Sequence, residues 1–219
     1  VQLRLSPIPE SIMAAVCHFP TLEKAVQTAQ QVIQYGVPIA RIEMLNKDQM
    51  GISINYSKLK DVEAVPTLFF EFHGSEQSNN ENIKVVEEIS KENSGSSFKW
   101  AKDLEDRNKL WKARWDVYYS VKALINNGRV YSTDVCLPIS KITECVNYAE
   151  EQAKKFGLRA PMVGHLGDGN FHVLLPFDPN KKETYKKIRE FNDLLIKKTL
   201  ELNGTITGEH GVGLHKKEY

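Results

Sequence analysis

Two histidines stand on either side of a glycine-rich turn, and imidazoles brought together in this way can bind a metal ion. His165 and His172 occur in the segment 164–172, which reads GHLGDGNFH and has an apolar run on each side. Two apolar runs joined by Asp-Gly predict a β-hairpin. If Asp168-Gly169 is a two-residue turn, or if the loop is the four residues 167–170, His165 lies directly opposite His172.

Opposed residues of a hairpin share one face, with Cβ atoms roughly 4.5–5.5 Å apart. Two imidazoles at that separation reach a single ion, at about 2.0–2.1 Å each for zinc. The alternative is that both histidines are polar residues of a solvated face, because histidine is intermediate in burial. The three glycines of the segment favour the metal site, since glycine is used where backbone turns sharply or approaches a ligand closely.

A second segment, 207–213, reads TGEHGVG and supplies a carboxylate and an imidazole between glycines. Together the two segments offer His165, His172 and Glu209, which form the three-ligand set of an open, catalytic metal site. His210 remains as a spare imidazole beside that set.

Composition limits the classes of partner that the chain can have. The 219 residues suit one large domain or two small ones, and 29 Lys and Arg balance 28 Asp and Glu. A net charge near zero gives no reason to expect a nucleic acid or an anionic membrane as partner. No apolar run approaches the roughly 18 residues of a membrane span, and the first residues do not resemble a secretory leader.

The three cysteines are Cys17, Cys136 and Cys145, without a C-x-x-C motif. An odd number in this arrangement argues against a disulfide framework or a structural zinc site, and favours a reducing compartment. No activating residues surround them, so we expect buried thiols rather than a catalytic one.

Strands and helices are expected to alternate along the chain, in an α+β arrangement of antiparallel sheet covered by helices. Strands are expected at 1–5, 11–19, 37–45, 67–73, 98–100, 130–138 and 205–207, besides the hairpin. Helices are expected from Thr21 to Gly36, over 50–62, 78–92 and 103–123, from a Ser140 cap to Gly157, and over 182–202.

The long helix expected at 103–123 carries Arg114 between two tryptophans, so its guanidinium is expected to be partly buried. A buried guanidinium needs an anion, and arginine pairs bidentately with carboxylates. Glu43 and Asn46 come at the end of the strand expected at 37–45, where a solvated strand end is the favoured interpretation.

Three segments resemble the C-terminal domain of FAD-linked oxidases, and the resemblance extends over the whole chain. They are 131–140 (YSTDVCLPIS), 164–172 and 207–213. The family includes D-lactate dehydrogenases, the FAD subunit of glycolate oxidase and D-2-hydroxyglutarate dehydrogenase; the first two resemble this chain most. The resemblance implies a ferredoxin-like α+β fold truncated at both ends. It implies a junction at 1–9 after a missing FAD-binding domain, and a substrate domain at 10–219 that is incomplete at its C-terminus.

The resemblance also implies roles for single residues, which the family's motifs transfer to this chain. His165, His172 and Glu209 would hold a divalent metal, Zn or Mn; His210 would be the catalytic base; Asn170 would lie near the flavin; and Arg114 would bind the substrate carboxylate. Ser132 stands where D-2-hydroxyglutarate dehydrogenases have Lys, which favours a small monocarboxylate substrate.

The activity implied by the resemblance is oxidation of a D-2-hydroxy acid, D-lactate or glycolate, to a 2-oxo acid, with hydride transfer to FAD. The expected partners are the small 2-hydroxy acid and an electron acceptor such as cytochrome c, a quinone or an electron-transfer flavoprotein; a homodimer is compatible. The expected location is cytoplasmic or mitochondrial, including the periphery of the inner membrane. The residues alone also allow a metal-dependent hydrolase or a non-catalytic ligand-binding fragment, and no turnover is expected without the flavin domain.

The remaining histidines, His18, His73 and His215, have no partnered motif. We expect them to be ordinary surface or core residues.

Overall fold

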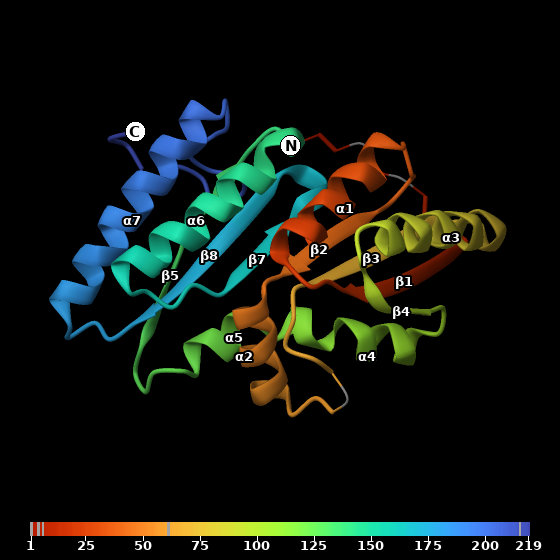
Figure 1. Ribbon diagram of the computed structural model, residues 1–219, viewed down its shortest axis with the longest axis horizontal. Coiled ribbons are helices and arrows are strands. Elements are labelled where there is room, and N and C mark those ends of the chain that lie inside the picture. The colour runs from red at the N-terminus through yellow and green to blue at the C-terminus, as the bar shows by residue number, and fades with distance from the viewer. Residues whose placement is uncertain (1, 4, 6, 61, 215) are drawn as a thin grey trace.

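The computed structural model of the chain describes all residues except Val1, Arg4, Ser6, Asp61 and His215. Within the described residues, the strands form one eight-stranded sheet in the order β4-β1-β3-β2-β7-β8-β5, with β6 also paired to β8. Every pair of neighbouring strands in the described residues is antiparallel, and helices lie on both sides of the sheet (Figure 1). The antiparallel α+β class expected from the sequence is therefore confirmed.

The first half of the chain has the ferredoxin-like arrangement. Its elements are β1 (Ser11–His18), α1 (Leu22–Gln34), β2 (Arg41–Leu45), α2 (Lys47–Ser57), β3 (Thr67–Gly74), α3 (Glu76–Glu92) and β4 (Ser96–Ala101). Strand β3 lies between β1 and β2, and β4 pairs with the outer side of β1. This is the split βαβ order 4-1-3-2.

The second half repeats that order less regularly. Its elements are α4 (Leu104–Trp115), α5 (Val117–Lys122), β5 (Arg129–Ser132), β6 (Val135–Cys136), α6 (Ile142–Phe156), β7 (Met162–His165), β8 (Asn170–Phe177) and α7 (Lys182–Glu201). Strand β8 lies between β7 and β5, and a bridge between Cys136 and Thr205 stands where a fourth strand would pair. Antiparallel pairing of β2 with β7 joins the two halves.

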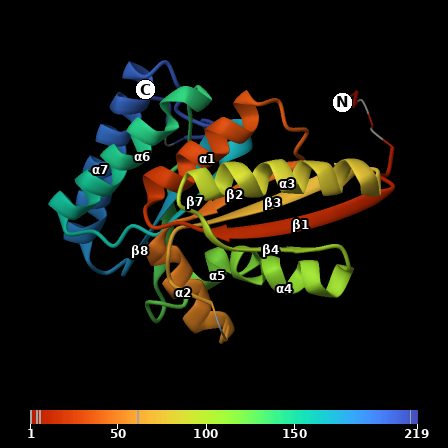
Figure 2. The same ribbon diagram turned by 45° about the vertical axis from the view of Figure 1, so that its right-hand side comes forward.

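Two apolar cores follow from the alternation of side chains along the strands. Helices α1, α3, α6 and α7 cover one face, and α2, α4 and α5 cover part of the other (Figures 1 and 2). On β8, for example, Val173 packs into the first core and Leu174 into the second. Polar residues on the second face must therefore be paired or lie where the helices leave that face open.

Local signals explain the best-defined helix. Thr21 caps α1 by accepting a hydrogen bond from the amide of Lys24 at 3.2 Å, and Gly36 follows the helix with φ +69°. The apolar stripe of the helix is buried against the sheet. None of the helices in the described part of the chain is both long and apolar enough to span a bilayer.

Three predicted elements differ from the structure. The helix expected at 103–123 is two helices, because Asp116 accepts hydrogen bonds from Ser57 and Lys112 that hold it at a break. The strand expected at 130–138 is interrupted at residues 133 and 134, whose side chains bind other segments. The segment 205–207 makes only a single bridge.

Further differences concern the first residues of the chain and the start of α6. The described residues Gln2, Leu3 and Leu5 are not in a strand, and the rest of that prediction lies outside the described residues. Ser140 lies in a 3-10 turn and makes no capping hydrogen bond to α6. All three cysteines are free thiols; Cys17 and Cys145 are buried as expected, whereas Cys136 is only half-buried.

Candidate metal centre

The two hairpin histidines share one face, although the predicted register is wrong by two residues. His165 pairs with Asn170, and His172 pairs with Val163. The loop consists of residues 166–169, with a 3-10 turn at Leu166–Asp168, rather than a two-residue turn. Because side chains alternate with period two, a shift of two residues preserves the face. The imidazoles are diagonal neighbours, with ring centroids 5.7 Å apart.

Gly169 closes this loop at a position that other residues would not fit. Its φ is +80°, and a Cβ atom there would lie 2.2 Å from the carbonyl oxygen of Leu137. Glycine is therefore required both for the backbone conformation and for the approach of the next segment. The tip of the hairpin is thereby fixed against the chain that follows β6.

Glu43 holds the ring of His165 from the neighbouring strand β2. Its Oε1 accepts a hydrogen bond from His165 Nδ1 at 2.8 Å, and its Oε2 accepts from Arg114 Nε at 3.0 Å. Burial alone would raise the pKa of Glu43, but these contacts lower it below its ordinary value. The bond to Glu43 raises the pKa of His165. The prediction that Glu43 and Asn46 lie at a solvated strand end is wrong, since only 5% of Glu43 and 4% of Asn46 are exposed.

His172 presents an unpartnered nitrogen to the same space. Its Nδ1 donates to the carbonyl oxygen of Thr133 at 2.8 Å, so Nε2 carries the lone pair. That buried Nε2 has no hydrogen-bond partner among the described residues, and Glu209 Oε1 lies 3.0 Å from it without forming one. Burial lowers the pKa of His172, which favours the neutral ring. The lone pair and the carboxylate oxygen repel each other at this distance, and a cation bound between them would remove that repulsion.

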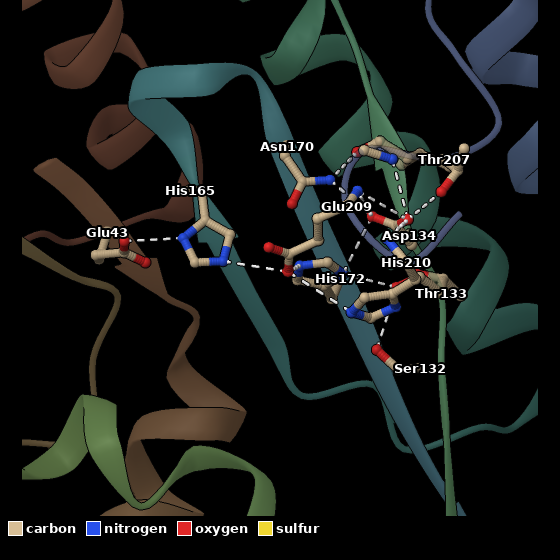
Figure 3. Close-up of polar contacts among 12 residues, drawn as sticks. Glu43, Ser132, Thr133, Asp134, His165, Asn170, His172, Thr207, Glu209 and His210 are labelled. Atoms are coloured by element: carbon tan, nitrogen blue, oxygen red, sulfur yellow. Dashed lines mark hydrogen bonds and ion pairs between the residues drawn. The ribbon is translucent and has the colours of Figure 1, made fainter. Parts of the chain in front are cut away.

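The loop that carries Glu209 and His210 is held by Asp134. The Asp134 carboxylate accepts hydrogen bonds from the Thr207 hydroxyl at 2.6 Å and from the backbone amides of Gly208 at 3.0 Å and His210 at 2.9 Å (Figure 3). The amide of Glu209 also donates to it, at 3.2 Å. Burial would raise the pKa of Asp134, but these hydrogen bonds hold it well below its usual range.

Two groups of side chains in the described part of the chain place possible ligand atoms within 4.8 Å of one another. One is His165, His172 and Glu209, the set expected from the sequence; the other is Asp134, His172 and His210. The oxygens of Asp134 are occupied by the loop amides, whereas Glu209 Oε1 lies 3.5 Å from His165 Nε2. The first group therefore fits a metal ion better.

His210 lies beside the candidate ligands without being one of the first group. Its ring stacks on that of His172, with centroids 4.9 Å apart and planes inclined by 13°. Its Nε2 is 3.6 Å from Glu209 Oε1, and about half of its side chain is exposed. The ring is thus accessible to a small molecule bound at the ligand cluster.

The other two expected site residues lie close to the cluster but are already engaged. Arg114 lines the same pocket as His165, His172 and Glu209, and its anion in the structure is Glu43. Asn170 donates through Nδ2 to Asp134 Oδ1 and to the Val135 carbonyl oxygen, each at 2.9 Å. Its Oδ1 has no partner among the described residues.

Both polar and apolar side chains line the pocket. Ser132 and the three histidines line it, and Val117, Val163 and Leu174 supply apolar surface. Among the described residues that line the pocket, Arg114 supplies the guanidinium that can bind an anion. Sequence reasoning did not identify Glu43 and Asp134 as site residues. Asp134 lies within the motif 131–140, whereas Glu43 is a lone carboxylate on a strand whose partner cannot be read from the sequence.

Known proteins resemble this chain over nearly its whole length. "Probable D-lactate dehydrogenase, mitochondrial" of Danio rerio is 43% identical over 98% of this chain and 43% of its own length. "D-lactate dehydrogenase (cytochrome), mitochondrial" of Arabidopsis thaliana is 34% identical over 100% of this chain and 38% of its own. "Glycolate oxidase subunit GlcD" of Bacillus subtilis is 27% identical, over 99% and 46%. The chain thus spans less than half the length of these relatives.

Solved structures of the same fold include enzymes whose names differ from those of these relatives. The 4-ethylphenol oxidase of Gulosibacter chungangensis superposes with a TM-score of 0.67 at 12% identity, over 93% of this chain and 46% of its own. For p-cresol methylhydroxylase the TM-score is 0.62 at 11% identity, over 92% and 46%. At these identities the likeness concerns the fold alone. A family profile described as "FAD linked oxidases, C-terminal domain" matches residues 8–219, and the chain therefore belongs to that family.

Proposed function

We propose that this chain is the substrate-binding domain of an FAD-dependent D-2-hydroxy acid dehydrogenase that converts D-lactate or glycolate to the 2-oxo acid. The observation that carries the proposal is the buried, unpartnered Nε2 of His172, which faces Glu209 and His165. Family membership and the names of the relatives support oxidation over metal-dependent hydrolysis.

The donor set suits a divalent cation such as Zn²⁺ or Mn²⁺. Two neutral imidazole nitrogens and one carboxylate form a three-ligand set that leaves room for a substrate oxygen. When bound, such a cation lowers the pKa of a coordinated hydroxyl, and FAD accepts a hydride. His165, His172 and Glu209 would hold the ion, and the wall of Val163 and Leu174 would keep water from that side of the substrate.

We assign proton removal to His210 and carboxylate binding to Arg114. The His210 ring is exposed, stacks on His172 and can accept a proton from a hydroxyl group beside Glu209. Arg114 contacts Glu43 through Nε and Nη2, which leaves Nη1 to bind a substrate carboxylate in the pocket that Arg114 lines with the candidate ligands. Asn170 keeps Oδ1 as a free acceptor for its proposed place near the flavin.

A small monocarboxylate is the substrate class that the pocket supports. Ser132 stands where D-2-hydroxyglutarate dehydrogenases have Lys, so this lining residue offers no second cation for a distal carboxylate. The lining also includes the apolar side chains of Val117, Val163 and Leu174. Relatives are named for a cytochrome and for mitochondria, so we propose a cytochrome acceptor and a mitochondrial location, with quinone or electron-transfer flavoprotein as alternative acceptors.

Lactate-dependent reduction of the flavin in the full-length protein tests the base assignment. His210→Ala should slow reduction by about 10²–10⁴-fold while leaving the flavin content unchanged, because general-base catalysis contributes about that much. His73→Ala is the control, because His73 pairs with Glu71 on β3, outside the ligand cluster. The flavin of this variant should be reduced at the normal rate. Near-normal reduction by His210→Ala would remove His210 from this role.

A further inference from the structure

The carboxylate of Glu43 is buried between a cation and an imidazole, and each of its oxygens has its own donor. Oε1 accepts from His165 Nδ1 at 2.8 Å, whereas Oε2 accepts from Arg114 Nε at 3.0 Å and lies 2.9 Å from Nη2. Only 7% of the Glu43 side chain is exposed. In Figure 3, Glu43 approaches His165 from the side opposite to Glu209 and His172.

This contact determines which nitrogen of His165 carries the proton. An ionised carboxylate only accepts hydrogen bonds, so Nδ1 must be the N–H of the neutral ring and Nε2 must hold the lone pair. Nε2 points toward Glu209, whose Oε1 is 3.5 Å away. The lone pair is therefore aimed at the space between the candidate ligands.

His172 reaches the same tautomer by another route. Its Nδ1 donates to the backbone carbonyl oxygen of Thr133, which any residue at that position would provide. In the case of His165 the acceptor is a buried side-chain carboxylate, and Arg114 is its counter-charge. A single substitution can thus alter one ligand and leave the other unchanged.

We propose that Glu43 is a positioning residue of the metal centre, which fixes His165 in the Nδ1–H tautomer and turns its Nε2 toward the ion, with Arg114 as the counter-charge. The inference rests on the metal site proposed above. Acceptors that orient histidine ligands commonly determine metal affinity in this way.

The substitution Glu43→Gln makes a directional prediction because Arg114 can only donate. The amide oxygen of Gln must face Arg114, which leaves the NH₂ group facing His165. The ring then accepts at Nδ1 and carries its proton on Nε2. The substitution should therefore reverse the tautomer and remove the lone pair from the metal side, with almost no change in side-chain volume.

Glu71 provides a matched control on the adjacent strand β3. It also joins an arginine to a histidine, with 3.1 Å to Arg41 Nη2 and 2.8 Å to His73 Nε2, and its side chain is 14% exposed. Neither partner belongs to the two possible ligand groups of the described residues. Glu71→Gln therefore removes the same chemical group without touching a candidate ligand.

The test uses the full-length protein and two measurements. Titration of metal-free protein with Zn²⁺ or Mn²⁺ should give an affinity about 10–100-fold lower for Glu43→Gln and unchanged for Glu71→Gln. Nitrogen-15 NMR of labelled histidines, under alkaline conditions where the rings are neutral, should show His165 as Nδ1–H in the wild type and as Nε2–H in Glu43→Gln.

The outcomes separate this inference from the proposed function. Wild-type affinity in Glu43→Gln, or an Nε2–H ring of His165 in the wild type, overturns the role of Glu43 while leaving the metal site intact. Absence of metal binding by the wild type overturns the metal site, and the tautomer then decides the orienting role alone. If Glu43→Gln does not fold, the wild-type NMR spectrum still gives a decisive reading.

Discussion

Replacing Asp134 by Asn should loosen the loop that carries Glu209 and His210. One carboxylate oxygen, Oδ2, accepts from the Thr207 hydroxyl and from three successive backbone amides of this loop. A hydrogen bond to a charged group contributes about 1.5–3 kcal/mol, and a neutral one about 0.5–1.5 kcal/mol, so neutralisation costs about 1 kcal/mol for each bond. Because the four bonds share one oxygen and are not additive, we expect a local loss of about 2–3 kcal/mol.

Hydrogen exchange measures this loss where it occurs. A local change of about 2–3 kcal/mol corresponds to exchange about 30–150-fold faster at the amides of residues 208–210 in Asp134→Asn. Asp178→Asn is the control, because Asp178 likewise accepts from a backbone amide, that of Asn180, but in a surface turn. Unchanged exchange at 208–210 in Asp134→Asn would refute the claim that the charge of Asp134 holds this loop.

Two further predictions concern stability. In a urea titration, Gly169→Ala should lower the free energy of unfolding by more than Gly157→Ala. Both glycines have a positive φ, which costs about 1–2 kcal/mol for Ala, but of the two only Gly169 would bring its new Cβ against backbone. Equal losses of stability would contradict the close approach of Gly169 to Leu137. Burial, assisted by the charge of Lys99, lowers the pKa of His18 below its ordinary 6.5, so the unfolded chain takes up the proton first as the pH falls. The folded state therefore keeps its full stability above about pH 6.5 and loses part of it as the pH falls below that value. His18→Asn can still donate a hydrogen bond to Thr67 and should make the urea midpoint less dependent on pH. An unchanged pH profile of urea midpoints would count against this assignment.

Periodicity and capping residues predicted most of the fold. Helix α1 follows its Thr21 cap and apolar stripe, and β3 follows an aromatic run bounded by proline and glycine. The repeat of the ferredoxin-like order could not be seen, because the second half replaces its fourth strand by one bridge at Thr205. The break at Asp116 depends on Ser57, a residue of another helix, and is therefore a tertiary effect.

The candidate ligands could be predicted, but their supports could not. His165, His172 and Glu209 were identified from glycine-rich motifs, and the error of two residues in register left the histidines on one face. Glu43 is buried because β2 pairs with β7 and because Arg114 arrives from 71 positions away. Neither contact leaves a signal in the sequence around Glu43, so the sequence alone favours a solvated position for this carboxylate.

The most direct test of the account is a crystal structure of the full-length protein grown with Zn²⁺ or Mn²⁺, with anomalous data collected at the absorption edge of the metal. We predict one ion bound by the Nε2 atoms of His165 and His172 and by the Glu209 carboxylate, at about 2.0–2.2 Å. An ordered domain in which these three side chains bind no ion, or in which the anomalous peak lies elsewhere, would contradict the account.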